Sequence, residues 1–104
     1  MADLPSDTFD INEIDDVIHG RVRLGIMAYL SSAGMADFSD LKARLKTTDG
    51  NLSVHLRKLE EAGFVEITKR FLGRKPLTEA QLTDAGRAAF MAYLDTLSAL
   101  IPPR

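Results

Sequence analysis

The spacing of apolar residues changes its period once, near Gly63, and this change limits the folds open to the chain. Before it, the leucines of residues 52–59 recur every three or four positions, which is typical of an amphipathic helix. After it, residues 64–71 alternate apolar and polar side chains, and residues 77–82 resume the alternation beyond a charged turn. Since glycine often ends a helix, the pattern predicts a helix leading directly into a two-stranded hairpin.

Helical spacing and capping residues predict the remaining elements. Thr48 and Thr83 are expected to cap the helices that follow them. The predicted order is an irregular arm over 1–9, a helix over 10–19, a helix over 21–31, a bridging strand over 35–38, a helix-turn-helix over 39–63, a wing over 64–82 and a helix over 83–101. The fold class is therefore α+β and mostly helical: one winged helix-turn-helix domain over 1–104, with a three-helix core, a two-stranded wing, and extra N- and C-terminal helices.

Composition narrows the class of protein. A chain of 104 residues, 45% of them hydrophobic, can bury one core. It has no cysteine, so neither a disulfide framework nor a thiolate metal site is expected. Residues 1–16 carry acids and no base, unlike a signal peptide, and no apolar run is long enough to span a membrane. We therefore expect a cytoplasmic protein.

The net charge of −2 hides an uneven distribution. Residues 1–20 hold acids with no base, whereas residues 42–75 are clearly basic. A basic block within an acidic chain is typical of a surface directed at a polyanion. The same imbalance also fits a solvated face of mixed charge.

The helix after Thr48 carries side chains suited to reading duplex DNA. Asparagine can pair with adenine, arginine and lysine with guanine, serine with phosphate or a base, and valine with a thymine methyl. Gly50 would let the helix N-terminus approach phosphate. The candidate contacts are Thr48, Gly50, Asn51, Ser53, Val54, His55, Arg57 and Lys58. Any surface helix also has a polar outer face, His55 equally suits a packing role, and Asp49 would be repelled by phosphate.

The wing carries a second basic cluster around Gly73. Lys69, Arg70, Arg74 and Lys75 surround the predicted hairpin tip, with no acid among them. Arginine is favoured in narrow, electronegative minor grooves, so we expect contact with phosphate or with the minor groove. An ordinary solvated turn would have a similar composition.

The run Asn51-Leu-Ser-Val-His-Leu-Arg-Lys-Leu-Glu-Glu-Ala-Gly-Phe-Val65 resembles the recognition helix and first wing strand of MarR/ArsR-type winged-helix regulators. Leu82-Thr83-x-x-Gly86-Arg87 resembles the segment in those regulators that joins the second wing strand to the last helix. The match is closest to a compact, single-domain type and covers about residues 11–97. The resemblance implies a transcription regulator that binds double-stranded DNA and forms dimers.

Apolar residues at both ends of the chain predict a homodimer. The last helix is apolar around most of its circumference and needs more cover than a small domain can supply. The candidate interface residues are Ile11, Ile14, Ile18, Phe90, Tyr93, Leu94, Leu97 and Ile101. A symmetric dimer would favour a palindromic site. The alternative is that this stripe packs wholly within one protomer.

Catalytic chemistry has little support in the sequence. His19 and His55 are far apart, and no phosphate-binding glycine loop or paired metal-ligand motif occurs. Asp15 and His19, four residues apart, suit a helix-end interaction better than a metal site. We therefore expect no enzyme, metal or cofactor, and the sequence leaves open whether a small-molecule effector exists. The alternative function is a winged-helix protein-interaction module without DNA binding.

Overall fold

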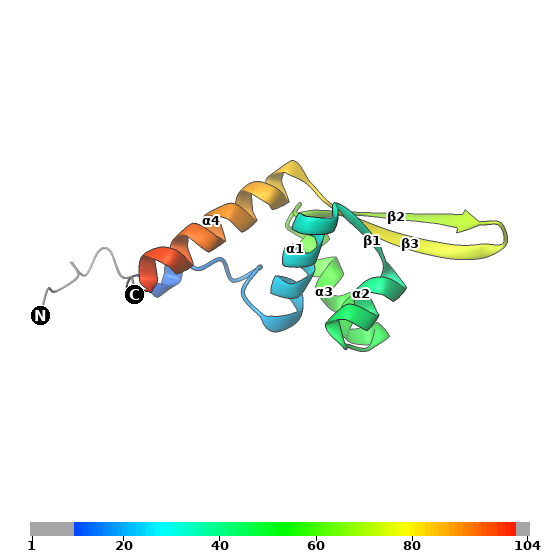
Figure 1. Cartoon of the computed structure of the whole chain (residues 1–104), viewed down its shortest axis with the longest axis horizontal. Helices are drawn as coiled ribbons and strands as arrows, with labels where there is room; N and C mark the ends of the chain where they lie inside the picture. Colours follow the sequence, from blue (N-terminus) through cyan, green and yellow to red (C-terminus); the bar gives the residue numbers. More distant parts are fainter. Residues whose placement is uncertain (1–9, 102–104) are drawn as a thin grey trace, which may run out of the picture.

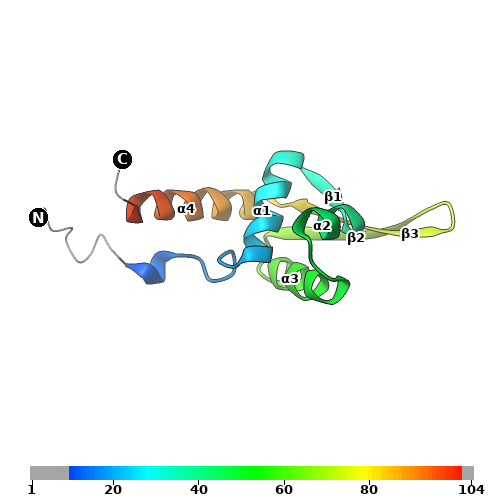
Figure 2. The ribbon, with the colours of Figure 1, turned by 60° about the horizontal axis from the view of Figure 1, so that its bottom comes forward.

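The computed structural model describes residues 10–101 (Figure 1). The elements are η2 (Ile11–Glu13), α1 (Arg21–Ala33), β1 (Met35–Asp37), α2 (Phe38–Leu45), α3 (Asp49–Glu61), β2 (Val65–Leu72), β3 (Lys75–Leu82) and α4 (Asp84–Leu100). Helices α1, α2 and α3 form a bundle, with the β2–β3 wing extending to one side and α4 to the other (Figures 1 and 2). The predicted fold class, a mostly helical α+β winged helix-turn-helix, is confirmed. The expected irregular arm, residues 1–9, lies outside the described residues.

The core lies where the three bundled helices meet the sheet. Its fully buried side chains include Ile26, Met27 and Leu30 of α1, Leu41 of α2, and Leu52 and Leu59 of α3. Val65, Ala80 and Leu82 close it from the sheet. Burying a side chain of this size stabilises the fold by about 1.5–3 kcal/mol. Helix α3 is therefore held in place by the apolar core beneath it.

The N-terminal segment differs from the helix predicted over residues 10–19. It forms only the short 3₁₀ helix η2, after which Ile14 is extended, with φ −70° and ψ 126°. The Asp15 carboxylate accepts a hydrogen bond from the amide of Val17 at 2.8 Å. A short acidic side chain so close to the backbone competes with helical hydrogen bonding, which explains why apolar spacing alone was misleading here. Ile18 is nevertheless fully buried in the core.

The sheet has three antiparallel strands in the order β1–β3–β2. Strand β1, the predicted bridging strand, pairs only with the end of β3 nearest the bundle. Strands β2 and β3 pair along their whole length, and the turn between them contains two residues, Gly73 and Arg74, rather than the longer turn predicted. Gly73 has φ +67°, which is typical of the first central position of a type II′ turn. Leu72, Lys75 and Pro76 consequently belong to the strands.

A single threonine joins α3, the wing and α4. The Thr83 hydroxyl donates a hydrogen bond to the Gly63 carbonyl oxygen at 2.6 Å and accepts one from the amide of Gly86 at 2.9 Å. Its own amide donates to the Phe64 carbonyl oxygen at 3.0 Å. A Cβ at Gly86 would collide with that same carbonyl group, so only glycine fits at this position. The relative placement of the three elements is thus determined at one corner.

Candidate nucleic-acid interface

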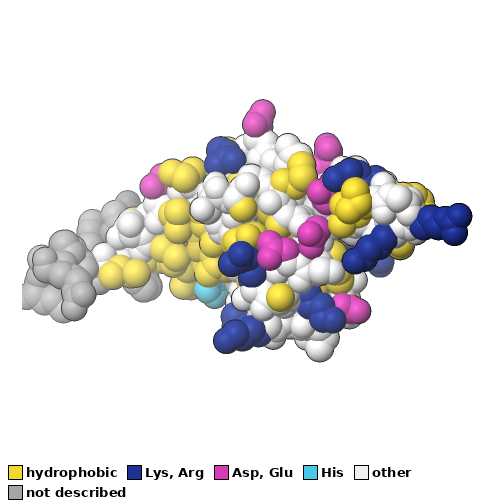
Figure 3. All heavy atoms as spheres, turned by 45° about the vertical axis from the view of Figure 1, so that its right-hand side comes forward, with side chains coloured by type: hydrophobic (Ala, Val, Ile, Leu, Met, Phe, Trp, Pro, Cys, Tyr) yellow, Lys and Arg dark blue, Asp and Glu magenta, His cyan; other side chains and the backbone are white. Residues whose placement is uncertain are grey.

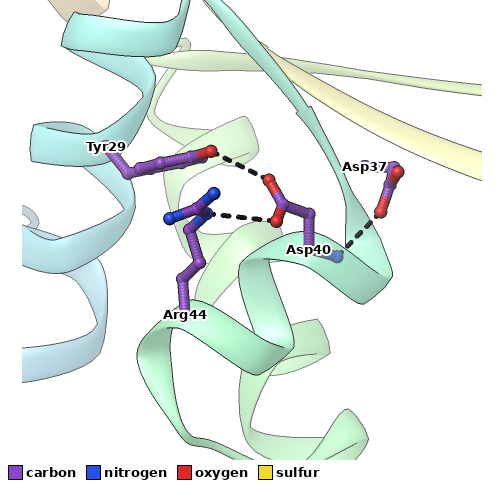
Figure 4. A network of polar contacts seen from close by, with 4 residues as sticks. All are labelled: Tyr29, Asp37, Asp40 and Arg44. Carbon is purple, nitrogen blue, oxygen red and sulfur yellow. Dashed lines mark hydrogen bonds and ion pairs between the residues drawn. The ribbon is translucent and has the colours of Figure 1, made fainter.

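Helix α2 is fastened to α1 by a small polar cluster (Figure 4). The Tyr29 hydroxyl donates to Asp40 Oδ2 at 2.9 Å, and Arg44 Nε donates to Asp40 Oδ1 at 3.1 Å. The Arg44 guanidinium carbon also lies 4.9 Å from the centre of the Tyr29 ring. The hydrogen bond to Asp40 raises the pKa of Tyr29 above its ordinary value. The Asp37 side chain caps α2 by accepting from the Asp40 amide.

Helix α3 has well-defined ends. The Thr48 hydroxyl accepts a hydrogen bond from the amide of Asn51 at 3.2 Å, which confirms the predicted cap. At the other end, Gly63 has φ +81°, and the Phe64 amide donates to the Leu59 carbonyl oxygen, as in a Schellman motif. Both signals were local in the sequence, and both predict the structure correctly.

The outer side of α3 presents most of the predicted recognition residues to solvent. Asn51, Ser53, Val54, Arg57 and Lys58 are exposed, and Gly50 has open space around it. Asp49, the acid expected to conflict with phosphate, forms an ion pair with Lys42 of α2 at 2.9 Å. This pair offsets much of the carboxylate charge in the first turn of α3.

His55 is not part of that exposed side. Its Nδ1 atom lies 2.9 Å from Arg23 Nη1, and the histidine is half-buried against α1. Arg23 also donates to the carbonyl oxygen of Val17 at 2.6 Å. Burial, together with the charges of Arg23 and Lys58, lowers the pKa of His55 below its ordinary value. Since Nδ1 must accept from the guanidinium, the imidazole is neutral and braces α3 against the N-terminal segment.

A groove of about 710 Å³ separates α3 from the wing. It is lined by Ser53, Leu56, Arg57 and Glu60 of α3, Ile67 and Lys69 of β2, Thr78 of β3, and Phe38 and Asp49. The structure thus brings together Arg57 and Lys69, from the two predicted basic clusters. Lys58 instead lines a separate hollow of about 420 Å³, together with Asp16, Arg23 and Glu61.

The wing residues fall on two faces. Cross-strand register places Ile67, Lys69 and Phe71 on the face that looks toward α3, and Arg70 on the opposite face. Arg70 Nε donates to Glu79 Oε1 at 2.8 Å, and this pairing lowers the pKa of Glu79. Part of the Arg70 charge is therefore balanced within the wing, while its side chain stays exposed, and its contact with DNA remains a prediction.

The wing tip is exposed and basic. Arg74 lies in the hairpin turn and Lys75 directly after it, and both are exposed. Figure 3 shows lysine and arginine side chains around this end of the molecule, with hydrophobic side chains among them. Neither residue forms an ion pair with any residue from 10 to 101.

The predicted dimer residues divide into two groups. Ile18, Phe90 and Tyr93 are buried in the chain's own core, with 0%, 7% and 3% of their surface exposed, so a partner has nothing further to cover there. Ile14 and Leu97 are half-buried against that core. Tyr93 also holds His19, with its hydroxyl oxygen 3.0 Å from His19 Nδ1.

The second group remains open to a partner. Ile11, Leu94 and Ile101 are exposed, and Met91 adds to them. At 100° per residue, Met91 and Leu94 lie on one side of α4, next to the inward stripe of Phe90, Tyr93 and Leu97, and Ile101 follows directly after the helix. Helix α4 thus has an inward apolar stripe and an uncovered one.

Known protein families include one with the winged-helix fold described above. The sequence matches the family described as Winged helix DNA-binding domain over residues 22–101. The chain belongs to this family. A protein of Methanocaldococcus jannaschii, itself of uncharacterised function, is 41% identical over 78 residues that cover 75% of this winged-helix chain and 85% of that protein.

Solved structures share the winged-helix architecture. The transcriptional regulator homologue of Pyrococcus horikoshii is 33% identical, with a TM-score of 0.73 over 86% of this chain and 94% of that one. The ArsR family regulator RHA00566 is 23% identical, with a TM-score of 0.57 over 96% of this chain and 95% of that one. Reduced AbfR bound to DNA is 16% identical, with a TM-score of 0.68 over 95% of this chain and 63% of that one, so these last two show likeness of fold alone.

The predicted resemblance to winged-helix regulators is confirmed, because the chain belongs to the winged-helix DNA-binding family and is similar to a transcriptional regulator homologue. Within residues 10–101, no group of three potential metal ligands comes together. No helix in that part of the chain has both the length and the apolar character needed to cross a bilayer.

Proposed function

We propose that the chain binds duplex DNA sequence-specifically as a homodimeric transcription regulator, with α3 in the major groove and the wing on the adjacent backbone or minor groove. The observation that carries this proposal is the shared groove of Arg57 and Lys69. Two cations from separate elements flank an open channel beside the exposed side of α3, where a phosphate backbone could lie between them. Asn51 and Ser53 are then positioned to reach base edges.

Lys75 and Arg74 extend the same contact to the wing tip, whereas in this proposal Arg70 and His55 keep their partners within the chain. Arg70 keeps Glu79 neutralised on the other face of the wing, and His55 holds Arg23. Thr48 caps the N-terminus of α3. The backbone amides around Gly50, in the first turn of that helix, are available to donate hydrogen bonds to phosphate.

Salt-titrated fluorescence anisotropy on a mixed-sequence duplex tests the DNA contact. Wild-type affinity should fall steeply with salt, because each neutralised phosphate contributes about −0.9 to the slope of log K against log[salt]. Arg57→Ala and Lys69→Ala should each reduce that slope by about one unit. The charge-balanced double variant Arg70→Ala/Glu79→Ala is the matched control and should leave the slope unchanged.

Absence of wild-type binding at low salt would overturn the proposal and favour the protein-interaction alternative. An equal loss of slope in the control double variant would show that the channel between α3 and the wing is not where the backbone lies. A base-reading role for Asn51 predicts that Asn51→Ala changes which sequences are selected from a random duplex pool, whereas Lys69→Ala weakens all sequences alike.

The dimer in this proposal rests on the uncovered stripe of α4. Large apolar side chains in such a row cost free energy in water, and a second copy would cover them on both protomers at once. Ile11 extends the apolar surface available from the N-terminal segment. A two-fold arrangement would place two α3 helices roughly 34–36 Å apart, one turn of DNA, and would favour a palindromic site.

Sedimentation velocity with a pair of adjacent variants tests the interface. Met91→Asp places a charge on the uncovered stripe and should dissociate the dimer at micromolar concentration. Ala92→Asp adds the same charge one position further round α4, away from that stripe, and should not. A monomeric wild type would refute the dimer, and dissociation by Ala92→Asp alone would move the interface to the alanine-rich side of α4.

A further inference from the structure

The wing tip exposes two large apolar side chains that the fold leaves uncovered. Phe71 is 70% exposed and Leu72 is 65% exposed, more than any other large hydrophobic residue among those described. The groove beside α3 is lined by wing residues only as far as Lys69 and Thr78, so Phe71 and Leu72 lie beyond the part of the wing that faces α3. Phe71 consequently adds little to the stability of the chain.

Strand register gives the two side chains different directions. Phe71 lies opposite Pro76, on the face of the wing shared with Ile67 and Lys69. Next to a two-residue turn, such a pair exchanges no hydrogen bonds and its side chains approach closely, so the proline ring flanks the phenyl ring. Leu72 lies on the opposite face.

The surroundings of Phe71 are cationic. Lys69 shares its face, Arg74 lies in the turn and Lys75 begins β3, and the hairpin carries no acid between Glu66 and Glu79. Glu79 is itself bound by Arg70. An apolar side chain surrounded by cations is complementary to a polyanion that has an apolar interior. Duplex DNA is such a polyanion, because its stacked bases lie between two rows of phosphates.

We propose that Phe71 is a wedge that enters the minor groove beside the α3 contact and partly unstacks one base step. Apolar side chains used in this way kink DNA and let more protein surface reach it. The narrow two-residue turn brings Phe71 close to the end of the hairpin, while Lys75 and Arg74 meet the flanking phosphates. The wedge rests on the proposed DNA contact and adds a deformation of the DNA to it.

Permanganate footprinting combined with salt-titrated anisotropy tests the wedge. The probe is a mixed-sequence duplex rich in TA steps, because such steps unstack readily and permanganate oxidises exposed thymines. Wild-type protein should make one or two thymines reactive. Phe71→Ala should abolish that reactivity and weaken binding about ten- to a hundredfold, in line with the loss of one stacked base, while leaving the salt slope unchanged.

Two further variants sharpen the result. Phe71→Leu keeps an apolar wedge and should retain much of the reactivity. Leu72→Ala removes a side chain of similar exposure on the other face and should behave like wild type. Because both positions are exposed, circular dichroism should show folded protein throughout. Equal reactivity and affinity in Phe71→Ala and wild type, or an effect confined to Leu72→Ala, would overturn the wedge.

The remaining outcomes separate this inference from the proposed function. If wild type fails to bind the duplex at low salt, both fail together. If it binds with a steep salt slope but produces no reactive thymine, only the wedge fails. A shift in sedimentation caused by Phe71→Ala would assign the tip to contact between copies. Retention on phosphatidylserine vesicles, lost in Phe71→Ala while DNA binding persists, would assign it to a membrane surface.

Discussion

Gly50 occupies the second position of α3, where stability and DNA binding should favour different residues. A Cβ added there would meet no atom within 4 Å, so the folded chain has room for alanine. Glycine in a helix costs about 0.5–1 kcal/mol relative to alanine, chiefly because it loses more backbone freedom on folding. At a first-turn position about half of that is expected, which for a domain of this size raises Tm by roughly 1–4 °C.

The same substitution should weaken DNA binding. The amides in the first turn of α3 have no helical partner, apart from that of Asn51, which is held by the Thr48 hydroxyl. In the proposed complex, these amides donate to a phosphate that approaches closely because Gly50 has no side chain. A methyl group would hold the phosphate away, and losing one charge-assisted hydrogen bond at about 1.5–3 kcal/mol corresponds to an affinity loss of roughly 10- to 150-fold.

Thermal unfolding and anisotropy on the same preparations check both effects of Gly50→Ala. Ser32→Ala, at an exposed position of α1 that lies outside both α3 and the uncovered stripe of α4, is the matched control. It should also raise Tm slightly, through helix propensity, with DNA affinity unchanged. A more stable Gly50→Ala protein that binds DNA as tightly as wild type would refute the close approach of phosphate to this turn. A lower Tm for Gly50→Ala would show that the folded chain has no room for a methyl group at this position.

Three other predictions concern the core, the histidine and the acid of α3. Gly86→Ala should lower the free energy of unfolding by about 1–3 kcal/mol or prevent folding, because the added Cβ collides with the Phe64 carbonyl group. Urea denaturation measures this free energy, and a change below about 0.5 kcal/mol would contradict the prediction. Because the folded state lowers the pKa of His55, the unfolded state binds more protons as pH falls below about 6.5, so stability should decline there. His55→Gln should flatten that decline in urea midpoints measured between pH 7.5 and 5.5, and an unchanged decline would point to another group. Asp49→Asn should release Lys42 and tighten DNA binding several-fold, with a salt slope steeper by about one unit; weaker binding would show that the carboxylate supports the interface.

Local signals in the sequence predicted local structure well. A threonine followed by a helical stripe predicts a cap, and the structure confirms this at both Thr48 and Thr83. The glycine at position 63 ends α3 as its position indicated. These features depend on hydrogen bonds within a few residues, so the relevant chemistry is present in a short segment of sequence.

Features that depend on partners distant along the chain were harder to predict. Arg70 and Glu79 are nine residues apart and meet only because the turn has two residues rather than five. Arg23 and His55 are 32 residues apart, and only the packing of α3 on α1 brings them together. The predicted helix over 10–19 failed for a related reason, because helical spacing of isoleucines also fits an irregular segment that buries one of them in the core.

The Thr83 corner has a consequence for how distance along DNA would be measured. One hydroxyl there bonds to the end of α3 and to the start of α4, and the Phe64 carbonyl group blocks any side chain at Gly86. In the proposed dimer, the separation of the two reading helices is then a property of each protomer's internal geometry as well as of the interface. A change in half-site spacing would require rebuilding this corner, so variants at Thr83 should alter the preferred number of base pairs between half-sites before they alter which bases are read.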